Sequence, residues 1–215
     1  DYNRSHYKHL TKWIILILRY YLAAQLINYG LSKIFYLQFG PASINNLNTL
    51  LGDKTPMGLL WTFMGHSKTY CVFTGLAEFI GGILLLSRRT TLLGALITFA
   101  VMINVMLLNY CFDVPVKLLS THMLVFSLII ASHWAKSLLS FFVFNKTTKA
   151  EILRDVVHQD FTQIKFYIKW GLLLIYISLQ IFRTYNFKIM RQEMNSVTSA
   201  LDGSHLIQQF KVYRD

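Results

Sequence analysis

The hydrophobic residues of this chain lie in long blocks rather than at the spacing of an amphipathic helix or a half-buried strand. A helix needs about 20 apolar residues to cross the hydrocarbon core of a bilayer. We predict a transmembrane helix in each of five blocks: 12–37, 69–87, 91–111, 116–134 and 166–182. Minimal loops join the second, third and fourth blocks, so these helices are predicted to be antiparallel neighbours.

A longer segment, 38–68, separates the first two blocks and contains Pro41 and Pro56. Its second half, 57–66, is apolar but too short to cross a bilayer. We predict an interfacial or re-entrant helix there, with Trp61 at the level of the lipid head groups.

Two segments outside the blocks have patterns of their own. Segment 145–163 alternates apolar and charged residues as an amphipathic helix does, and we predict a surface helix on the inner leaflet. Segment 204–213 has strand character without a partner strand, and an isolated strand is not stable. It either pairs with another protein or belongs to the front part of a longer chain.

The pattern as a whole predicts an all-α integral membrane protein. We expect the five helices to form a small bundle, with an interfacial helix in the first outer loop. The predicted parts are a cytoplasmic N-terminus (1–11), the membrane bundle (12–134), a cytoplasmic loop with an amphipathic helix (135–164), the fifth transmembrane helix (165–183) and an extracytoplasmic tail (184–215).

Composition and charge agree with a membrane protein. Hydrophobic residues make up 54% of the chain and charged residues 14%, well below the ~25% charged residues of soluble domains. The formal net charge is +11, but the lysines and arginines stand at the ends of apolar blocks and form no basic face. Nucleic-acid binding is therefore not expected.

The basic residues also predict an orientation. They precede the first block, fill the turn at Arg88 and Arg89, and recur between the fourth and fifth blocks. All three segments fall on one side, which the positive-inside rule makes cytoplasmic. We expect a multi-pass protein of the bacterial cytoplasmic (inner) membrane, with its N-terminus inside and its C-terminal tail outside.

Glu78 places a carboxylate in the middle of the second block, where it costs about 3 kcal/mol and requires a partner. At a rise of about 1.5 Å per residue, Arg19 lies about 10 Å and Glu78 about 16 Å from the cytoplasmic surface. We therefore predict an Arg19–Glu78 ion pair. Asn104 lies between this level and a second polar layer near the outer surface, made of Lys33, Asn109, Asp113 and Lys117.

The polar residues share helix faces with small residues. At about 100° per residue, one face of the first block carries Arg19, Ala23, Leu26, Gly30 and Lys33. One face of the second block carries Cys71, Thr74, Gly75, Glu78, Gly81 and Gly82. Small residues let helix backbones approach closely in membranes, so both faces are predicted to point into the bundle.

Two interpretations of these polar residues remain open. In the first, they form a pocket that handles a ligand or a proton, lined by Arg19, Lys33 and Glu78. In the second, they are structural ion pairs that fix the register of the helices. The candidate ligand-binding residues are Arg19, Lys33, Glu78, Asn104, Asn109, Asp113 and Lys117, and no residue is assigned a catalytic role.

The cysteines and histidines do not indicate a cofactor or metal site. Cys71 and Cys111 lie toward the outer ends of neighbouring blocks, outside any C-x-x-C motif. We expect two unpaired thiols, with a disulfide on an oxidising outer side as the alternative. His122 has no histidine at equal depth on a facing block, so neither haem nor another metal site is expected.

Three stretches of the sequence resemble proteins of the DoxX-like family. Residues 19–33, with Arg19, Gly30 and Lys33, are similar to its first helix, and 78–94 resembles the junction of its second and third helices. Residues 104–109 and 113–117 resemble the turn between its third and fourth helices. The similarity covers about 19–134, and the loop at 61–67 resembles larger members of the Bacteroidetes type.

This resemblance implies a four-helix DoxX-like bundle to which the chain adds a fifth helix and a tail. Some members of the family are subunits of thiosulfate:quinone oxidoreductases or other membrane oxidoreductase complexes. The chain is then a redox-associated subunit that binds a quinone or another apolar ligand near Glu78. It carries no haem, flavin or iron–sulfur motif, so a partner subunit would supply the electron carrier and this chain would be at most an accessory subunit.

Two other functions remain open. A non-enzymatic scaffold or anchor would contact other membrane or extracytoplasmic subunits through residues 184–215. A transporter would pass a small solute through the polar interior of the bundle, although transporters usually carry inverted repeats and none is evident in this sequence.

Overall fold

The computed structural model describes residues 5–147 and 162–196 of the chain, and within these ranges every regular element is a helix. The predicted strand-like segment 204–213 lies outside the described residues. Most of the predicted surface helix at 145–163 also lies outside them. The all-helical prediction is confirmed for the described part of the chain.

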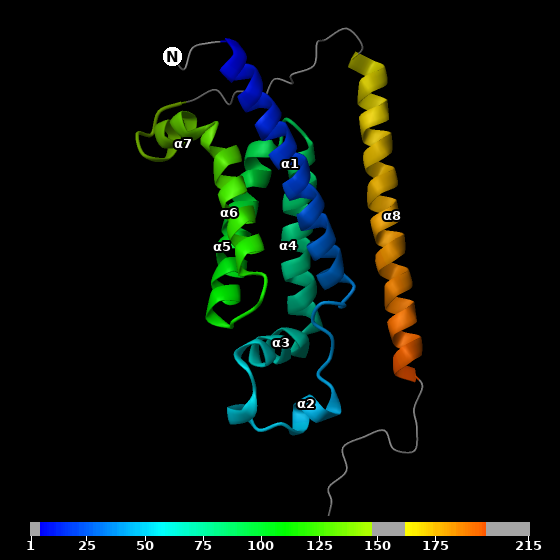
Figure 1. The fold of residues 1–215 in the computed structure, drawn as a ribbon. Coiled ribbons are helices and arrows are strands. Elements are labelled where there is room, and N and C mark those ends of the chain that lie inside the picture. Colours follow the sequence, from blue (N-terminus) through cyan, green and yellow to red (C-terminus); the bar gives the residue numbers. More distant parts are fainter. Residues whose placement is uncertain (1–4, 148–161, 197–215) are drawn as a thin grey trace, which may run out of the picture.

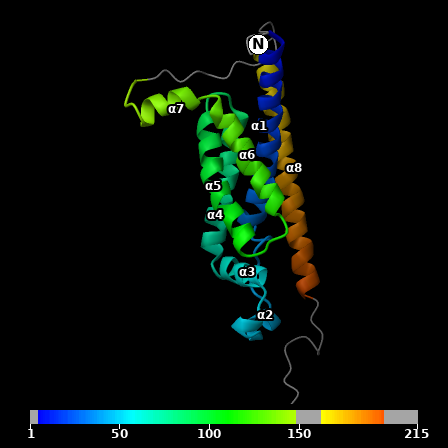
Figure 2. The ribbon, with the colours of Figure 1, turned by 60° about the vertical axis from the view of Figure 1, so that its left-hand side comes forward.

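Four helices form an antiparallel bundle: α1 (Ser5–Ile34), α4 (Lys68–Leu86), α5 (Thr91–Cys111) and α6 (Lys117–Ser132). Each of them packs on the next in the chain, and α6 returns to contact α1, which closes the bundle (Figures 1 and 2). The turn containing Arg88 and Arg89 lies at the same end of the bundle as the start of α1 (Figure 1). The start of α1 and the Arg88–Arg89 turn, which belong to two of the three basic segments, therefore lie at one end of the bundle, while the side of the membrane that this end faces stays a prediction.

Three helical segments in the described part of the chain are long and apolar enough to cross a membrane: Leu10–Ile34, Lys68–Leu86 and Thr91–Cys111. A fourth span exists if α6 and α7 (Ala135–Phe142), which bend by 78° at a short break, count together. The predicted fourth block was expected to continue to residue 134. The helix ends at Ser132, and Trp134, two residues later, is buried in the core and 3% exposed.

The segment between α1 and α4 contains α2 (Ile44–Asn48), a 3-10 turn (Leu51–Asp53) and α3 (Pro56–His66). Thr55 caps α3 by accepting a hydrogen bond from the Gly58 amide at 3.1 Å, and Pro56 occupies the first turn, where its missing N–H is not needed. Ser67 caps α4 in the same way, accepting from Tyr70. The short helix predicted at 57–66 is confirmed, while its place at the membrane surface stays a prediction.

The last described helix, α8 (Thr162–Ser196), lies along α1 (Figures 1 and 2). Leu173 and Tyr176 pack against the main core, and Arg191 donates to the Leu37 carbonyl oxygen at 2.7 Å. The helix was expected to end at residue 182, and it continues to Ser196, with neither glycine nor proline between residues 183 and 196. It is not among the helices apolar enough to cross a membrane, so a fifth span stays a prediction.

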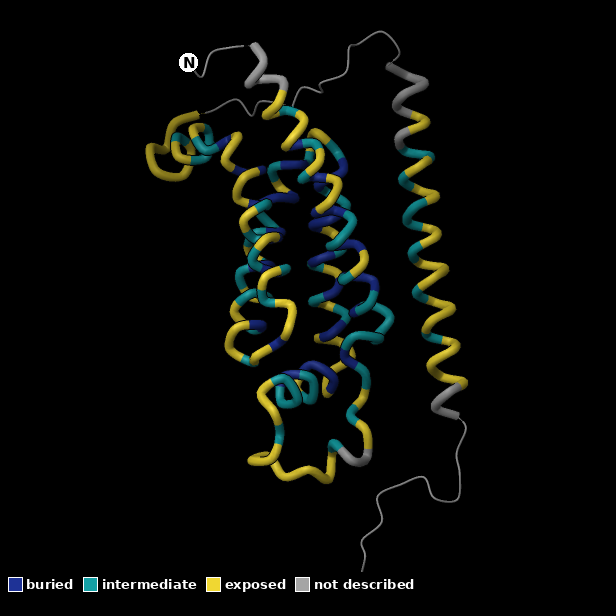
Figure 3. The backbone as a smooth tube through the Cα atoms, in the orientation of Figure 1, coloured by how far each residue is buried: buried dark blue, intermediate teal, exposed yellow. Residues whose placement is uncertain are grey.

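The two faces predicted for the first and second spans point into the bundle (Figure 3). Their backbones meet at Gly30 and Gly75: a Cβ atom added to either glycine would lie 2.8 Å from the carbonyl oxygen of the other. A second close approach lies at Gly82, where an added Cβ would lie 3.1 Å from the Ala23 carbonyl oxygen. These contacts fix the register of α1 against α4.

Candidate functional site

The centre of the site is a buried ion pair between α1 and α4. The Lys33 ammonium donates to Glu78 Oε1, and the two residues are 5% and 3% exposed. Lys33 follows Gly30, and Glu78 follows Gly75, by about one helical turn on its own helix. The pair therefore stands where the two backbones come closest.

This pairing corrects the predicted Arg19–Glu78 ion pair. In the register set by the glycine contacts, Glu78 lies level with Ile27. Arg19 is then eight residues, or about 12 Å, away along the helix axis, whereas Lys33 is about 9 Å away and on the side toward which its chain reaches. The prediction failed because depth counted from the expected ends of the blocks placed Arg19 too close to Glu78.

Arg19 instead reaches the end of α4. Its Nε and Nη2 atoms both donate to the Leu85 carbonyl oxygen, at 3.1 and 3.0 Å, and the residue is 2% exposed. The last four carbonyl groups of a helix have no partner within the helix, and a cation there also interacts favourably with the helix dipole. Arg19 therefore caps α4, which supports an architectural role for this residue.

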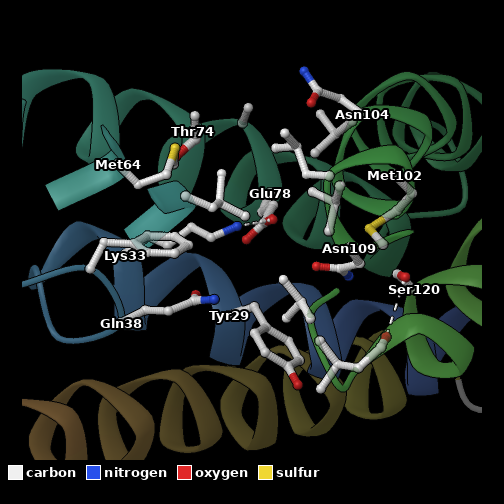
Figure 4. A pocket seen from close by; sticks show the side chains of 18 of the residues that line it. Tyr29, Lys33, Gln38, Met64, Thr74, Glu78, Met102, Asn104, Asn109 and Ser120 are labelled. Carbon is white, nitrogen blue, oxygen red and sulfur yellow. Dashed lines mark hydrogen bonds and ion pairs between the residues drawn. The ribbon is translucent and has the colours of Figure 1, made fainter. Parts of the chain in front are cut away.

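A cavity of about 330 Å³ opens beside the Lys33–Glu78 pair (Figure 4). Its lining is mostly apolar and comes from α1, α3, α4, α5, α6 and the adjoining loops. The polar residues in the lining are Tyr29, Lys33, Gln38, Thr74, Glu78, Asn104, Asn109 and Ser120. Aromatic and methionine side chains supply much of the remaining wall: Phe39, Trp61, Met64, Tyr70, Phe73, Met102 and Met123.

One polar atom in this lining is left without a partner. Glu78 Oε2 is buried and has no hydrogen bond within the described residues, whereas Oε1 is held by Lys33. In Figure 4 the carboxylate stands beside the Lys33 ammonium at the centre of the cavity, with Tyr29 and Asn109 across from it. A buried acceptor without a donor is destabilising by about 1–3 kcal/mol, so this oxygen is the strongest sign of a ligand.

The cavity opens sideways between α4 and α5. These helices touch near one end, where a Cβ added to Gly94 would lie 2.8 Å from the Leu85 amide nitrogen. Toward the other end, Tyr70 and Phe73 of α4 and Asn104 of α5 are exposed residues of the lining, as is Val116 before α6. A molecule dissolved in the bilayer could therefore enter laterally.

The end of the cavity that lies away from the Arg88–Arg89 turn is covered by α3. Leu60 and Met64 are buried there beside Phe39. The Tyr36 hydroxyl donates to the Gly65 carbonyl oxygen and ties α3 to the end of α1. Burial raises the pKa of Tyr36 above its usual value, with a smaller contribution from Cys71, so the hydroxyl keeps the proton that it donates.

Four of the seven predicted ligand-binding residues line the cavity: Lys33, Glu78, Asn104 and Asn109. Asn109 is 7% exposed, whereas Asn104 is exposed and its amide points away from Glu78 in Figure 4. The predicted outer polar layer is therefore divided, because Lys33 turns inward to Glu78 while Asp113 and Lys117 lie outside the cavity lining.

Asp113 and Lys117 pair with each other at an exposed turn, one helical turn apart. Asp113 has a positive φ of 52°, a conformation that aspartate tolerates better than most residues. This pair lies at the start of α6, and neither residue lines the cavity.

Sequence reasoning missed several residues of the lining. Tyr29 precedes Lys33 by one helical turn, and this spacing placed it on the same face. Ser120 shares the inward face of α6 with Met123 and Ser127, which are also buried. Trp61 and Met64 were assigned to a surface helix, and nothing in the sequence indicated that α3 covers the end of a cavity.

Cys71 and Cys111 are free thiols in the structure. Cys71 is buried, and its Sγ lies 3.5 Å from the Lys33 carbonyl oxygen, while Cys111 is exposed at the end of α5. The difference in burial places the two sulfur atoms in different environments.

Comparison with known proteins gives a family. The DoxX family model matches residues 14–110, which include α4, most of α1 and nearly all of α5. An uncharacterized protein of Bacillus subtilis (strain 168), YwoB, is 37% identical over 123 residues, which cover 57% of this chain and 78% of the relative. No solved structure matches the chain. The matched residues carry both Lys33 and Glu78, and the chain belongs to the DoxX family.

Proposed function

We propose that the bundle binds an apolar ligand with a polar head group, of the quinone class, in the cavity beside Lys33 and Glu78. The protein would act as an accessory subunit of a membrane oxidoreductase. The observation that carries this proposal is the unpartnered Glu78 Oε2, a buried polar atom in an otherwise apolar cavity.

The residues present fit a quinone-type head group. A volume of about 330 Å³ is at the lower end of the range of small-molecule sites, about 300–1,000 Å³, and suits a ring rather than a long tail. Trp61 and Phe73 offer apolar walls, and the opening between α4 and α5 gives an isoprenoid tail a route to lipid. Lys33 and Asn109 offer donors for a ring oxygen.

A bound quinone would supply a two-electron acceptor inside the membrane. The chain itself would bind the ring, orient it and keep water away from it. The electron carrier would come from a partner subunit, because the sequence has no motif for one.

The test is binding in native lipid particles. The purified protein is extracted with organic solvent and the extract is analysed for quinones by mass spectrometry. Added duroquinone or its reduced form duroquinol, both without a tail, is expected to raise the thermal unfolding midpoint, because a ligand that binds only the folded state stabilises it. Asp113→Asn is the matched control, since it removes a carboxylate outside the cavity, and it should keep the response. No co-purified quinone and no change in the midpoint would reject the proposal.

A second candidate function, assembly with other membrane subunits, is favoured by the exposed face of α8. Apolar residues recur there at alternating steps of three and four, with Asn186 at one position: Ile168, Leu172, Ile175, Leu179, Phe182 and Ile189. This is the spacing of a helix–helix seam, and a single asparagine in such a seam fixes its register. A scaffold role would use this face.

Cysteine cross-linking distinguishes the two functions. Leu179→Cys in a background without Cys71 and Cys111 should cross-link to a partner in membranes if α8 carries an interface. Tyr167→Cys, on another face of the same helix, is the control. Equal cross-linking at both positions would contradict a specific interface on α8.

A further inference from the structure

We infer that the cavity selects a neutral ligand whose head group carries a hydroxyl that donates to Glu78 Oε2, as a hydroquinone does and a quinone does not. This inference rests on the proposed function and names the chemical form of its ligand.

Charge in the cavity excludes ions. Lys33 and Glu78 compensate each other as a buried pair. Among the residues that the structure describes, no further Asp, Glu, Lys or Arg side chain belongs to the lining. Because these two charges already neutralise each other, an added cation or anion would find no free counter-charge in the cavity. An additional buried charge without a partner is strongly unfavourable, so the ligand is neutral.

Hydrogen bonding then decides between neutral ligands. As the carboxylate partner of the Lys33 ammonium, Glu78 is ionised, and its Oε2 atom therefore only accepts hydrogen bonds. The carbonyl oxygen of a quinone also only accepts, so it would leave Oε2 unsatisfied and face its lone pairs. The hydroxyl of a hydroquinone donates to Oε2 and still accepts from a remaining hydrogen of Lys33 or from the Asn109 amide.

Asn109 does not alter this preference. Its side chain is buried and lines the cavity. A carboxamide offers both donors and an acceptor, so it can serve either form of the ring. Glu78 therefore determines the preference for a hydroquinone over a quinone.

Three probes of the same ring size test the inference: duroquinol, duroquinone and the dimethyl ether of duroquinol. Affinities are measured under anaerobic conditions for the full chain in lipid particles, by thermal shift and by equilibrium binding. Duroquinol is expected to bind about tenfold or more tightly than either other probe, because both leave a buried acceptor unpaired. The ether carries oxygen atoms at the same positions as duroquinol, but it has no hydroxyl hydrogen to donate.

Glu78→Gln sharpens the test. The glutamine carbonyl can take the place of Oε1 as acceptor for Lys33, and its amide then presents N–H groups to the cavity. The preference should invert, with duroquinone binding more tightly than duroquinol. Asp113→Asn, the equivalent change in the exposed pair, should leave the wild-type preference intact.

The outcomes distinguish a failure of the hydroxyl requirement from a failure of the proposed function. Equal or tighter binding of duroquinone to the wild-type protein overturns the hydroxyl requirement and leaves the proposed function standing. Binding of the dimethyl ether as tightly as duroquinol does the same. Failure of all three probes to bind overturns both. If Glu78→Gln does not fold, the comparison of duroquinol with its ether in the wild-type protein decides alone.

Discussion

Two lysine–carboxylate pairs in this bundle have the same chemistry and opposite surroundings. Lys33 and Glu78 are 45 residues apart in sequence, and their side chains are 6% and 3% exposed. Asp113 and Lys117 are four residues apart on one turn, with side chains 76% and 34% exposed. The first pair joins two helices beside a cavity, whereas the second stands at a turn.

The difference shows why an ion pair must be judged by its environment. An exposed pair competes with solvent and typically contributes about 0–1 kcal/mol. A buried pair has lost its solvation, so removal of one partner leaves an uncompensated charge and is strongly destabilising. Glu78 adds a second feature that Asp113 lacks, a buried oxygen with no donor within the described residues. Burial and incomplete hydrogen bonding together mark a binding site.

The largest expected effect comes from breaking the buried pair. Glu78→Ala leaves the Lys33 ammonium buried without a counter-charge, and we expect a loss of about 3–5 kcal/mol of stability. The measurement is the unfolding midpoint in detergent or lipid particles. The double variant Lys33→Met with Glu78→Leu removes both charges and should recover most of the loss while binding no duroquinol. Recovery of both stability and binding would show that the pair is only a structural lock.

A smaller effect is expected from the cap on α4. Arg19→Met removes two charge-assisted hydrogen bonds to the Leu85 carbonyl oxygen, and hydrogen bonds to charged groups contribute about 1.5–3 kcal/mol. Arg19→Lys keeps the charge and should lose less. Since Arg19 lies outside the cavity lining, duroquinol affinity of the folded fraction should not change. A selective loss of affinity would return Arg19 to the ligand site.

The contact between α1 and α4 offers a geometric test of the same comparison. Gly30→Ala places a methyl group 2.8 Å from backbone atoms of α4, and overpacking of this kind is destabilising by about 1–3 kcal/mol. It should also separate Lys33 from Glu78 and weaken ligand binding, while the Asp113–Lys117 pair is untouched. Gly171→Ala in α8 is the control: nothing lies within 4 Å of its added Cβ. That control should be neutral or stabilising, because alanine favours helix.

The smallest effect is expected at the exposed pair. Asp113→Asn keeps a residue that tolerates a positive φ and removes only the charge, so the change in stability should be about 0–1 kcal/mol. High salt should remove even this difference, because exposed charges are screened. A loss comparable with that of Glu78→Ala, measured by the same unfolding midpoint, would contradict the contrast between the two pairs.

Sequence patterns predicted the individual helices well. The third block, 91–111, has the bounds of α5, and the second differs from α4 by one residue at each end. Long apolar blocks bounded by polar turns leave little freedom, because every backbone hydrogen bond at membrane depth must be satisfied within the segment. The patterns were less informative for α8, whose polar second half continues the helix beyond the apolar block.

The candidate site was predicted only in part, since Glu78 and Lys33 were both selected but each was assigned to a different polar layer. Such layers follow from depth along separate helices, whereas a contact depends on how far one helix is shifted against its neighbour. Trp61 and Met64 of α3 were missed for a related reason. Their place at the end of the cavity depends on contacts with α4 and with the end of α1.

The sequence by itself determined which segments are helical and which faces turn inward, because a regular backbone rise converts spacing along the chain into position around a helix. It also placed a carboxylate and an ammonium on two such faces. The tertiary structure decided that they meet. The Gly30–Gly75 contact sets the register of α1 against α4, and this register pairs Glu78 with Lys33, sends Arg19 to the end of α4, and leaves one carboxylate oxygen facing a cavity.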